Sequence, residues 1–227
     1  MSENKHDYSC PVGQENCRAI NAISNLQLRT TELETQVQTD ALTGLLNFRG
    51  FEERLEQEME RTRRLEEPTS LIMIDIDHFK QVNDTHGHDV GNQALIHIAG
   101  LLRQTLRKLD IPCRFGGEEF ALILPSTRLA PAVQVAERIR VLIERMPIKV
   151  GRKKIAMTIS LGTTSFTPID TLSPTEFLKS ADTYLYQAKH TGRNCTCHPP
   201  IDLSTEKAAV SSKERQDLFA AFGRKEP

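Results

Sequence analysis

The sequence predicts an α/β domain in which helices pack on a single sheet. Three observations favour this fold class: an apolar run of strand length at residues 71–75, two short apolar runs at 111–115 and 120–124 around a pair of glycines, and helical patterns that alternate with them. With 227 residues, the chain is long enough for one well-cored domain with tails.

The first part of the domain is expected to run helix, strand, helix. Residues 48–65 are rich in Glu and Arg with apolar positions at helical spacing, and Pro68 closes that helix. The strand at 71–75 follows, and a loop through Gly87 leads into a second helix at about residues 90–109.

The second part begins with the hairpin. Its Gly116-Gly117 pair suits a two-residue turn, which needs positive φ at the central positions. A helix is expected at about residues 130–145. Residues 154–161 are expected to form a strand, followed by another strand that runs to Phe166.

The last helix has clear boundary signals. Ser173 and Pro174 resemble an N-cap followed by a proline in the first helical position, and the helical pattern runs to about His190. Gly192 suits the end of that helix.

Carboxylates stand at the ends of two predicted strands. Asp75 and Asp77 close the apolar run, and alternation places both on one face of the sheet. Glu118 and Glu119 follow the glycines directly, where alternation would point their side chains to opposite faces. Asp-x-Asp alone is more often a solvated strand end, but with the Gly-Gly-Glu-Glu hairpin it indicates a nucleotide–metal site in which Asp75 and Glu118 supply acids for Mg²⁺.

Four motifs in this chain resemble those of one family. The run at residues 116–120 resembles the signature of GGDEF-domain diguanylate cyclases, in its Glu-for-Asp variant. Residues 39–47, 75–88 and 188–194 resemble further motifs of that family, in the family's order. The resemblance covers Asp40 to about Asn194.

The resemblance implies a fold and a reaction. The expected fold is a palm-like domain with a central, mostly antiparallel sheet and helices packed on it, preceded by an N-terminal helix. Each monomer is expected to bind one GTP, and each 3′-hydroxyl attacks the α-phosphate of the nucleotide in a facing monomer. The products are cyclic di-GMP and two pyrophosphates, and the expected cofactor is Mg²⁺ (or Mn²⁺).

The resemblance also implies roles for individual residues. The metal would be held by Asp75, the Ile76 carbonyl and Glu118, and it would neutralise phosphate charge. Catalysis would fall to Glu118, Glu119 and Lys80, with Glu119 (or Glu118) assisting deprotonation of the 3′-hydroxyl. The substrate contacts would come from Phe79, Lys80, Asn83, His88, Asn92, Gly116, Gly117, Lys189 and Arg193.

Purine recognition departs from the family pattern. Residues 87–92 read Gly-His-Asp-Val-Gly-Asn, so Asn92 stands where the family has Asp. A carboxylate accepts two hydrogen bonds from the guanine edge, whereas an amide offers one acceptor and one donor, a pattern better matched to adenine. GTP remains the favoured substrate, and relaxed purine choice giving mixed cyclic dinucleotides is the alternative.

A second family feature precedes the hairpin. Arg107 and Asp110 fit the Arg-x-x-Asp pattern of the product-inhibition site, and Arg138 occupies the position of a further arginine in that site. Arginine can grip phosphate bidentately while Asp110 accepts hydrogen bonds from guanine. Cyclic di-GMP is therefore expected as an inhibitory ligand.

Composition limits the other partners. The net charge of −1 gives no broad basic face for nucleic acid or an anionic membrane. No apolar stretch approaches the ~20 residues that span a bilayer, and no signal peptide opens the chain. No nucleic-acid or membrane partner is expected, and the cytoplasm, where GTP is available, is the expected location.

The chain is expected to divide into four segments: a polar head at 1–17, a signalling or dimerisation helix at 18–38, the cyclase domain at 39–197 and a partly disordered tail at 198–227. Apolar spacing in the helix favours a homodimer, although a lone helix packed on its own domain is the alternative. The seam would contain Ala19, Ile23, Leu26, Thr30, Leu33 and Val37.

Cysteines and histidines near both ends form a weaker pattern. Those of the head and tail could join as a metal or redox site, although their spacing matches no standard zinc pattern. Cys113 is expected to be an inert core thiol. The residues of this hypothesis are His6, Cys10, Cys17, Cys195, Cys197 and His198.

Two other function classes stay open. The domain could bind nucleotide or cyclic di-GMP without turnover, although intact Asp75, Glu118 and Glu119 argue against this. Alternatively, the N-terminal helix could recruit a partner, which would make the chain an interaction module. No sensor domain identifies the activating signal.

Overall fold

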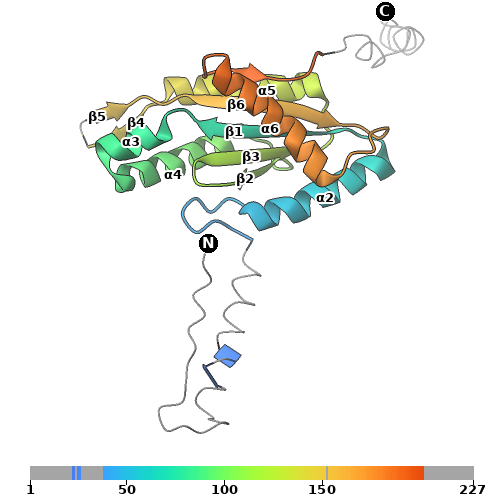
Figure 1. Ribbon diagram of the computed structural model, residues 1–227, viewed down its shortest axis with the longest axis horizontal. Coiled ribbons are helices and arrows are strands. Elements are labelled where there is room, and N and C mark those ends of the chain that lie inside the picture. Colours follow the sequence, from blue (N-terminus) through green and yellow to red (C-terminus); the bar gives the residue numbers. More distant parts are fainter. Residues whose placement is uncertain (1–21, 24, 27–37, 152, 202–227) are drawn as a thin grey trace, which may run out of the picture.

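The computed structural model describes residues 22–23, 25–26, 38–151 and 153–201. Within these residues, the central sheet has the strand order β2-β3-β1-β6-β7, and β4 pairs with β5 in a separate hairpin (Figure 1). All strand pairs are antiparallel except β6 with β7, so the expected mostly antiparallel sheet is confirmed. The strands are β1 Thr69–Ile76, β2 Ile111–Arg114, β3 Glu119–Leu124, β4 Ile148–Val150, β5 Lys153–Ile155, β6 Ile159–Phe166 and β7 Thr196–Cys197.

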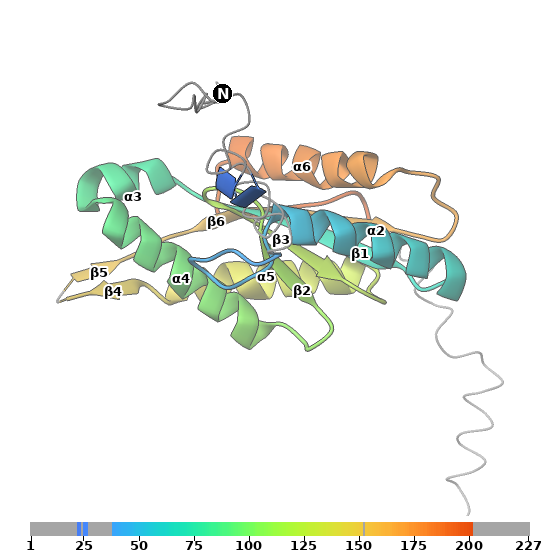
Figure 2. The same ribbon diagram turned by 90° about the horizontal axis from the view of Figure 1, so that it is seen from below.

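Helices cover both faces of this sheet. One face packs against α4 and α5, and the other packs against α2 and α6 (Figure 2). The helices are α2 Phe48–Leu65, α3 Phe79–His86, α4 His88–Thr105, α5 Leu129–Arg145 and α6 Pro174–His190. The expected palm-like architecture of helices on one sheet is confirmed.

Strand β1 separates two apolar clusters because its side chains alternate. Ile72 and Ile74 belong to the cluster beneath α4 and α5, whereas Leu71 and Met73 belong to the cluster beneath α2 and α6. All eight residues of β1 are buried, as expected for a central strand. The same alternation places Asp75 on the face covered by α6.

Local sequence explains where two helices begin. Asn47 caps α2, since its side chain accepts a hydrogen bond from the Gly50 amide. Ser173 and Glu176 form a reciprocal capping box at the start of α6, followed by Pro174 in the first turn. The predicted start of the last helix is confirmed.

The segment predicted as a loop through Gly87 contains a further helix, α3, so that prediction was wrong. Gly87 has φ 87° and separates α3 from α4, which begins at His88. Phe79 is the one buried residue of α3, which explains why apolar periodicity did not reveal this helix. Helix α4 also ends earlier than predicted, at Thr105, because Leu106 is extended.

The boundary between the two strands predicted over residues 154–166 lies earlier than expected. Residues 153–155 pair with β4, which was not predicted, and β6 begins only at Ile159. Met157 lies between β5 and β6 and is buried against the α4–α5 cluster. Residues 156–158 therefore contribute a core side chain and are not part of a strand.

The glycine turn also differs from the prediction. Residues 115–118 connect β2 to β3, and the amides of Phe115 and Gly116 both donate to the Glu119 carbonyl. Neither Gly116 nor Gly117 has a positive φ. A four-residue connection does not require the left-handed conformation that a two-residue turn imposes.

Several predictions fall outside the described residues. Of the predicted dimerisation helix, the structure describes only Ala22, Ile23, Asn25 and Leu26, which are helical and exposed. The head cysteines and most of the predicted tail also lie outside. None of the helices in the described part of the chain combines the length and apolar character needed to cross a bilayer.

Candidate active site

An acidic cluster lies where β1 ends and β3 begins. Asp75 pairs in register with Glu119 on one side and with Ser160 on the other. Register partners in neighbouring strands share a face, so the Asp75 and Glu119 side chains both point toward α6. The Lys189 ammonium of α6 lies 2.6 Å from Asp75 Oδ2, and the Asp75 side chain is only 10% exposed.

The electrostatic effects within the cluster are mutual. Burial raises the pKa of Asp75, against the hydrogen bond and charge of Lys189, while the Asp77 charge adds to the rise. Burial and the charge of Asp75 raise the pKa of both Glu118 and Glu119. Glu118 and Glu119 were expected on opposite faces of one strand, but Glu118 lies in the turn before β3, and both carboxyls come under the influence of Asp75.

The donor chemistry of this cluster fits a hard divalent cation. Carboxylate oxygens of Asp75 and Glu118 and the carbonyl of Ile76 are oxygen donors, the type that Mg²⁺ prefers, with phosphate oxygens completing its shell. Within the described residues, no three His, Cys, Asp or Glu side chains gather closely enough to hold a metal by themselves. The predicted set of two carboxylates and one carbonyl does not require such a group.

Asp77 has a structural position that the sequence did not reveal. Its buried carboxylate accepts hydrogen bonds from Thr158 Oγ1 at 2.7 Å, Ser160 Oγ at 2.6 Å and the Asn194 amide at 3.0 Å. It therefore joins the end of β1 to β6 and to the segment after α6. Its same-face relation to Asp75 was predicted, but its partners lie too far along the chain to be inferred.

The segment that follows α6 carries a run of left-handed residues. Gly192, Arg193 and Asn194 have φ 119°, 64° and 46°, a conformation that costs free energy for the two non-glycine residues. Asn194 is held on both sides, because its Nδ2 donates to Glu144 and its Oδ1 accepts from Arg140. Arg193 is exposed, and its positive charge acts to lower the pKa of Asp75. The structure thus brings Lys189 and Arg193 to the acidic cluster.

Helices α3 and α4 carry the residues predicted to bind the nucleotide. Lys80, His88 and Asn92 are exposed, while the Phe79 ring is buried in the core. Asn83 Oδ1 is buried without a hydrogen-bond partner, and a Cβ atom at Gly91 would overlap it. A buried acceptor without a hydrogen-bond partner costs free energy in a native protein. Asn83 Oδ1 is therefore a candidate acceptor for a hydrogen bond from a ligand.

Arg114 braces the glycine turn, and sequence reasoning missed its role. Its Nη2 and Nε donate to the Gly117 carbonyl at 2.8 and 3.3 Å, and its Nη1 lies 3.1 Å from Asp40 Oδ2. Burial favours the neutral form of Asp40, but hydrogen bonds from Thr43 and Arg114 outweigh this and lower its pKa. The place of Arg114, two residues before the signature run at 116–120, was the available signal.

The predicted product-inhibition residues gather around the end of α4. The Arg107 amide donates to Asp110 Oδ2 at 2.8 Å, and the Arg138 guanidinium donates to the Thr105 carbonyl at 3.2 Å. Both arginines are exposed. Helix α5 therefore places Arg138 near the end of α4, close to Arg107 and Asp110.

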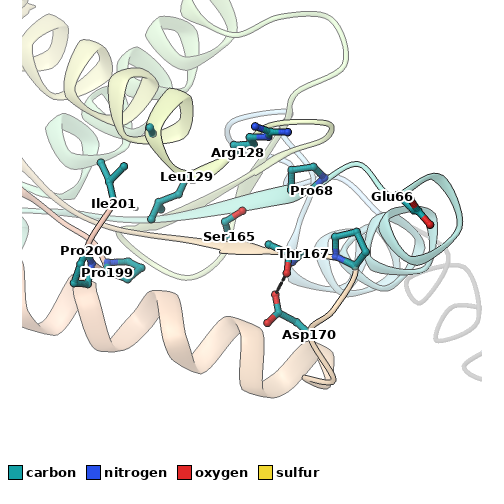
Figure 3. A pocket seen from close by; sticks show the side chains of 12 residues that line it. Glu66, Pro68, Arg128, Leu129, Ser165, Thr167, Asp170, Pro199, Pro200 and Ile201 are labelled. Carbon is teal, nitrogen blue, oxygen red and sulfur yellow. Dashed lines mark hydrogen bonds between the residues drawn. The ribbon is translucent and has the colours of Figure 1, made fainter. Parts of the chain in front are cut away.

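Two cavities lie near the sheet ends. One of about 390 Å³ borders Asp77 and α3, beside the acidic cluster. A larger one of about 580 Å³ lies at the opposite end of β1, where Pro68, Leu129, Ser165 and Ile201 line it (Figure 3). Because Asp75 and Glu119 are absent from the lining of the larger cavity, volume alone does not identify the reactive site.

Comparison with known proteins agrees with this geometry. Residues 37–195 match the family model described as "Diguanylate cyclase, GGDEF domain". The chain is 45% identical over 158 residues to the response regulator PleD of Caulobacter vibrioides; the match covers 69% of this chain and 35% of PleD, so the chain spans about a third of that relative.

Two solved structures are similar as well. One is the diguanylate cyclase SiaD of Pseudomonas aeruginosa in complex with its activator SiaC, with TM-score 0.68 and 37% identity over 79% of this chain and 69% of that one. The other is the coiled coil and GGDEF domain of DgcB from Caulobacter crescentus in complex with c-di-GMP, with TM-score 0.68 and 27% identity over 79% of this chain and 95% of that one. With a family model that spans most of the domain, the chain belongs to the GGDEF-domain family of diguanylate cyclases.

Proposed function

We propose that this protein condenses two GTP molecules into cyclic di-GMP and two pyrophosphates, at a site formed by two facing monomers. The observation that carries the proposal is the cluster of Asp75, Glu118 and Glu119, with the cations Lys189 and Arg193 beside it. Membership in the GGDEF-domain family is the reason for assigning GTP condensation to this cluster. The need for GTP makes the cytoplasm the expected compartment.

Each residue of the cluster has a chemical task in this proposal. Glu119, or Glu118, accepts the proton of the 3′-hydroxyl, and a raised pKa brings such a base closer to the pH at which it works. Lys80, Lys189 and Arg193 contact the phosphates and stabilise the negative charge that develops during transfer. The Phe79, Gly116 and Gly117 backbones provide further phosphate contacts, while Asn83, His88 and Asn92 bind the nucleoside.

We propose Mg²⁺ (or Mn²⁺) as the cofactor, held by Asp75, the Ile76 carbonyl and Glu118. When bound, the ion neutralises phosphate charge and lowers the pKa of a coordinated hydroxyl. In the free protein, the Lys189 ammonium forms an ion pair with Asp75. Binding of GTP with its metal would let this ammonium move toward a phosphate.

Product identification tests the proposal. The protein is incubated with GTP and Mg²⁺, and the nucleotide products are separated and identified by mass. We expect cyclic di-GMP and pyrophosphate, and a loss of at least about 100-fold in rate for Glu119→Gln. Tight binding of GTP or cyclic di-GMP with no turnover would instead support the catalytically silent binding module.

Product inhibition forms a separate part of the proposal. Arg107, Asp110 and Arg138 would bind cyclic di-GMP and slow the enzyme. Arg107→Ala is expected to abolish inhibition by added product without reducing the initial rate, while Lys108→Ala, one residue further on the same exposed turn, serves as the matched control. Equal inhibition of the wild type and Arg107→Ala would refute this site.

Relaxed purine use is the second candidate function, and Asn92 favours it. This exposed amide on α4 replaces the family's Asp, and loss of one bidentate arm is worth roughly 1–3 kcal/mol of base discrimination. Reactions with GTP, ATP and an equal mixture distinguish the two, because a relaxed enzyme yields a mixed cyclic dinucleotide. Asn92→Asp should then shift the product toward cyclic di-GMP, and exclusive cyclic di-GMP from the wild type removes this candidate.

A further inference from the structure

Cys195 and Cys197 form a thiol pair at the edge of the sheet, close to the candidate active site. The Cys195 carbonyl accepts a hydrogen bond from the Leu161 amide at 2.9 Å, and Cys197 pairs in register with Gly162 in β6. Residues two apart in an extended chain share a face, so both thiols point toward α6. The Cys195 thiol donates to the Ala188 carbonyl of that helix at 3.5 Å.

Cys197 affects the ionisation of the Cys195 thiol. Burial raises the pKa of Cys195, and the charge of Cys197 and a hydrogen bond to its thiol raise it further, with smaller effects from Asp77 and Glu137. Both cysteines are partly exposed, whereas Cys113 is buried in the core, where its pKa rises to about 12. Among the described cysteines, this pair alone combines a neighbouring thiol with access to solvent.

We propose that Cys195 and Cys197 are a redox modification site, which a small-molecule disulfide such as oxidised glutathione converts to a reversible disulfide. The Cys197 thiolate attacks one glutathione sulfur, so a Cys197–glutathione disulfide forms and one glutathione thiolate leaves. Cys195 then loses its proton to solvent and attacks the Cys197 sulfur, which releases the second glutathione. Two protein thiols are oxidised and one glutathione disulfide is reduced to two thiols.

The strand geometry makes such a disulfide reducible. A rise of about 3.3 Å per residue places the two Cα atoms about 6.6 Å apart, near the upper limit of about 6.8 Å for disulfides. Bond formation therefore requires the chain at Thr196 to contract. Strand β7 has two residues and pairs with β6 on one side, so contraction disturbs few hydrogen bonds. A strained bridge of this kind has a high reduction potential and is readily reversed.

The pair is coupled to the candidate active site through the chain. Asn194, next to Cys195, donates its amide to Asp77, and Arg193 precedes it in the left-handed conformation. Contraction at Thr196 would pull on this segment and displace the Arg193 guanidinium from the acidic cluster. This consequence rests on the proposed function, and it predicts that oxidation lowers cyclase activity by at least about tenfold, since small misplacements of a phosphate-binding group are costly.

Peptide mapping of the full chain tests the site without reference to activity. The protein is equilibrated in glutathione redox buffers of increasing oxidised fraction, free thiols are blocked, and trypsin is added. Cleavage after Arg193 and Lys207 places both cysteines in one peptide, residues 194–207. We expect this peptide to lose two hydrogens and to resist thiol blocking, and dithiothreitol to reverse both changes, while Cys113 stays reduced.

Three results would overturn the site. The 194–207 peptide could keep two free thiols, it could end as an unresolved glutathione adduct, or it could be joined to the 6–18 peptide that carries Cys10 and Cys17. Cys195→Ser and Cys197→Ser should remove the intramolecular bridge and keep the wild-type melting temperature. In the activity arm, both variants should be insensitive to oxidised glutathione. An oxidised wild type with full activity would refute the coupling to Arg193. A protein that is inactive under every condition would refute the proposed cyclase activity. In that case the peptide map still tests the redox site.

Discussion

Asp77 is 5% exposed, and its carboxylate accepts hydrogen bonds from two hydroxyls and one backbone amide. These contacts engage both of its oxygens, Oδ1 with Ser160 and Oδ2 with Thr158 and Asn194. Because the Asn194 amide is one of its three donors, Asp77 fixes the left-handed segment that carries Arg193. We interpret Asp77 as a positioning residue for Arg193.

Substitutions at Asp77 separate this role from simple stability. Asp77→Ala leaves the Thr158, Ser160 and Asn194 donors without an acceptor, at a cost of about 1–3 kcal/mol for each buried group left unpaired. Asp77→Asn keeps an acceptor for Asn194, and the Ser160 hydroxyl can rotate to accept from the new amide. We expect Asp77→Ala to raise KM for GTP and Asp77→Asn to have a KM close to that of the wild type. Denaturant titration measures the free energy of unfolding of both variants. Equal KM values for both variants and the wild type would contradict the positioning role.

The ionised Glu119 carboxylate is expected to lower the stability of the folded protein. Burial and the charge of Asp75 raise its folded-state pKa, so the ionised carboxyl is less stable in the folded protein than in the unfolded chain. The resulting loss of stability is absent below the ordinary glutamate pKa of 4.5 and develops as the pH rises through the raised folded-state pKa.

Glu119→Gln should therefore raise the melting temperature at neutral pH, and this gain should disappear at acidic pH, where the wild-type carboxyl is protonated. Thermal unfolding across this pH range, alongside the rate loss expected above, checks both effects. Glu56→Gln on the exposed surface of α2 is the control. A pH-independent effect of Glu119→Gln on stability would contradict the electrostatic explanation.

At the scale of elements, α4 offers a matched pair of glycines. A Cβ at Gly91 would overlap Asn83 Oδ1, whereas a Cβ at Gly100 meets nothing within 4 Å. Gly91→Ala should displace Asn83 and weaken GTP binding, while Gly100→Ala should stabilise the helix by about 0.5–1 kcal/mol. Isothermal calorimetry and thermal unfolding of both variants test this, and unchanged GTP affinity in Gly91→Ala would contradict a role for Asn83 in nucleotide binding.

The β2–β3 hairpin depends on Arg114, which links its turn to Asp40 at the start of the domain. Arg114→Ala should destabilise the protein by about 1–3 kcal/mol, since charge-assisted hydrogen bonds to the Gly117 carbonyl and Asp40 are lost together. Arg114→Lys should recover only part of this, because an ammonium lacks the planar fork. Arg64→Ala, whose partner Glu60 lies 3.9 Å away on exposed α2, should change stability by less than about 1 kcal/mol. Denaturant unfolding compares them, and equal costs for Arg114→Ala and Arg64→Ala would show that the brace contributes little.

For the whole molecule, the reaction requires two half-sites to meet, so activity should depend on protein concentration. A fragment of residues 38–201 should show a rate per monomer that rises with concentration, because its half-sites meet only by collision. The full chain should reach its maximal rate at lower concentration if residues 18–38 dimerise, and Leu33→Lys should shift it toward the fragment by placing charge in the predicted seam. Identical concentration dependence of the fragment and the full chain would exclude this helix as the dimerising element.

Local patterns determined a large part of the fold. The helices at 48–65 and from Ser173 to His190 and the buried strand β1 follow from periodicity and caps that lie within a few residues of each other. Helix α3 did not follow, because a short helix with Phe79 as its one buried residue leaves no apolar period to detect.

The sequence by itself determined the family, the α/β architecture and the acids that surround the glycine turn, because motif order and strand alternation are local properties. Tertiary structure alone decided how these acids are held. Asp40 meets Arg114 across 74 residues, and Asn194 meets Asp77 across 117. Such contacts form only after the sheet brings β1, β2 and the segment after α6 together, and no local pattern encodes which donor reaches which carboxylate.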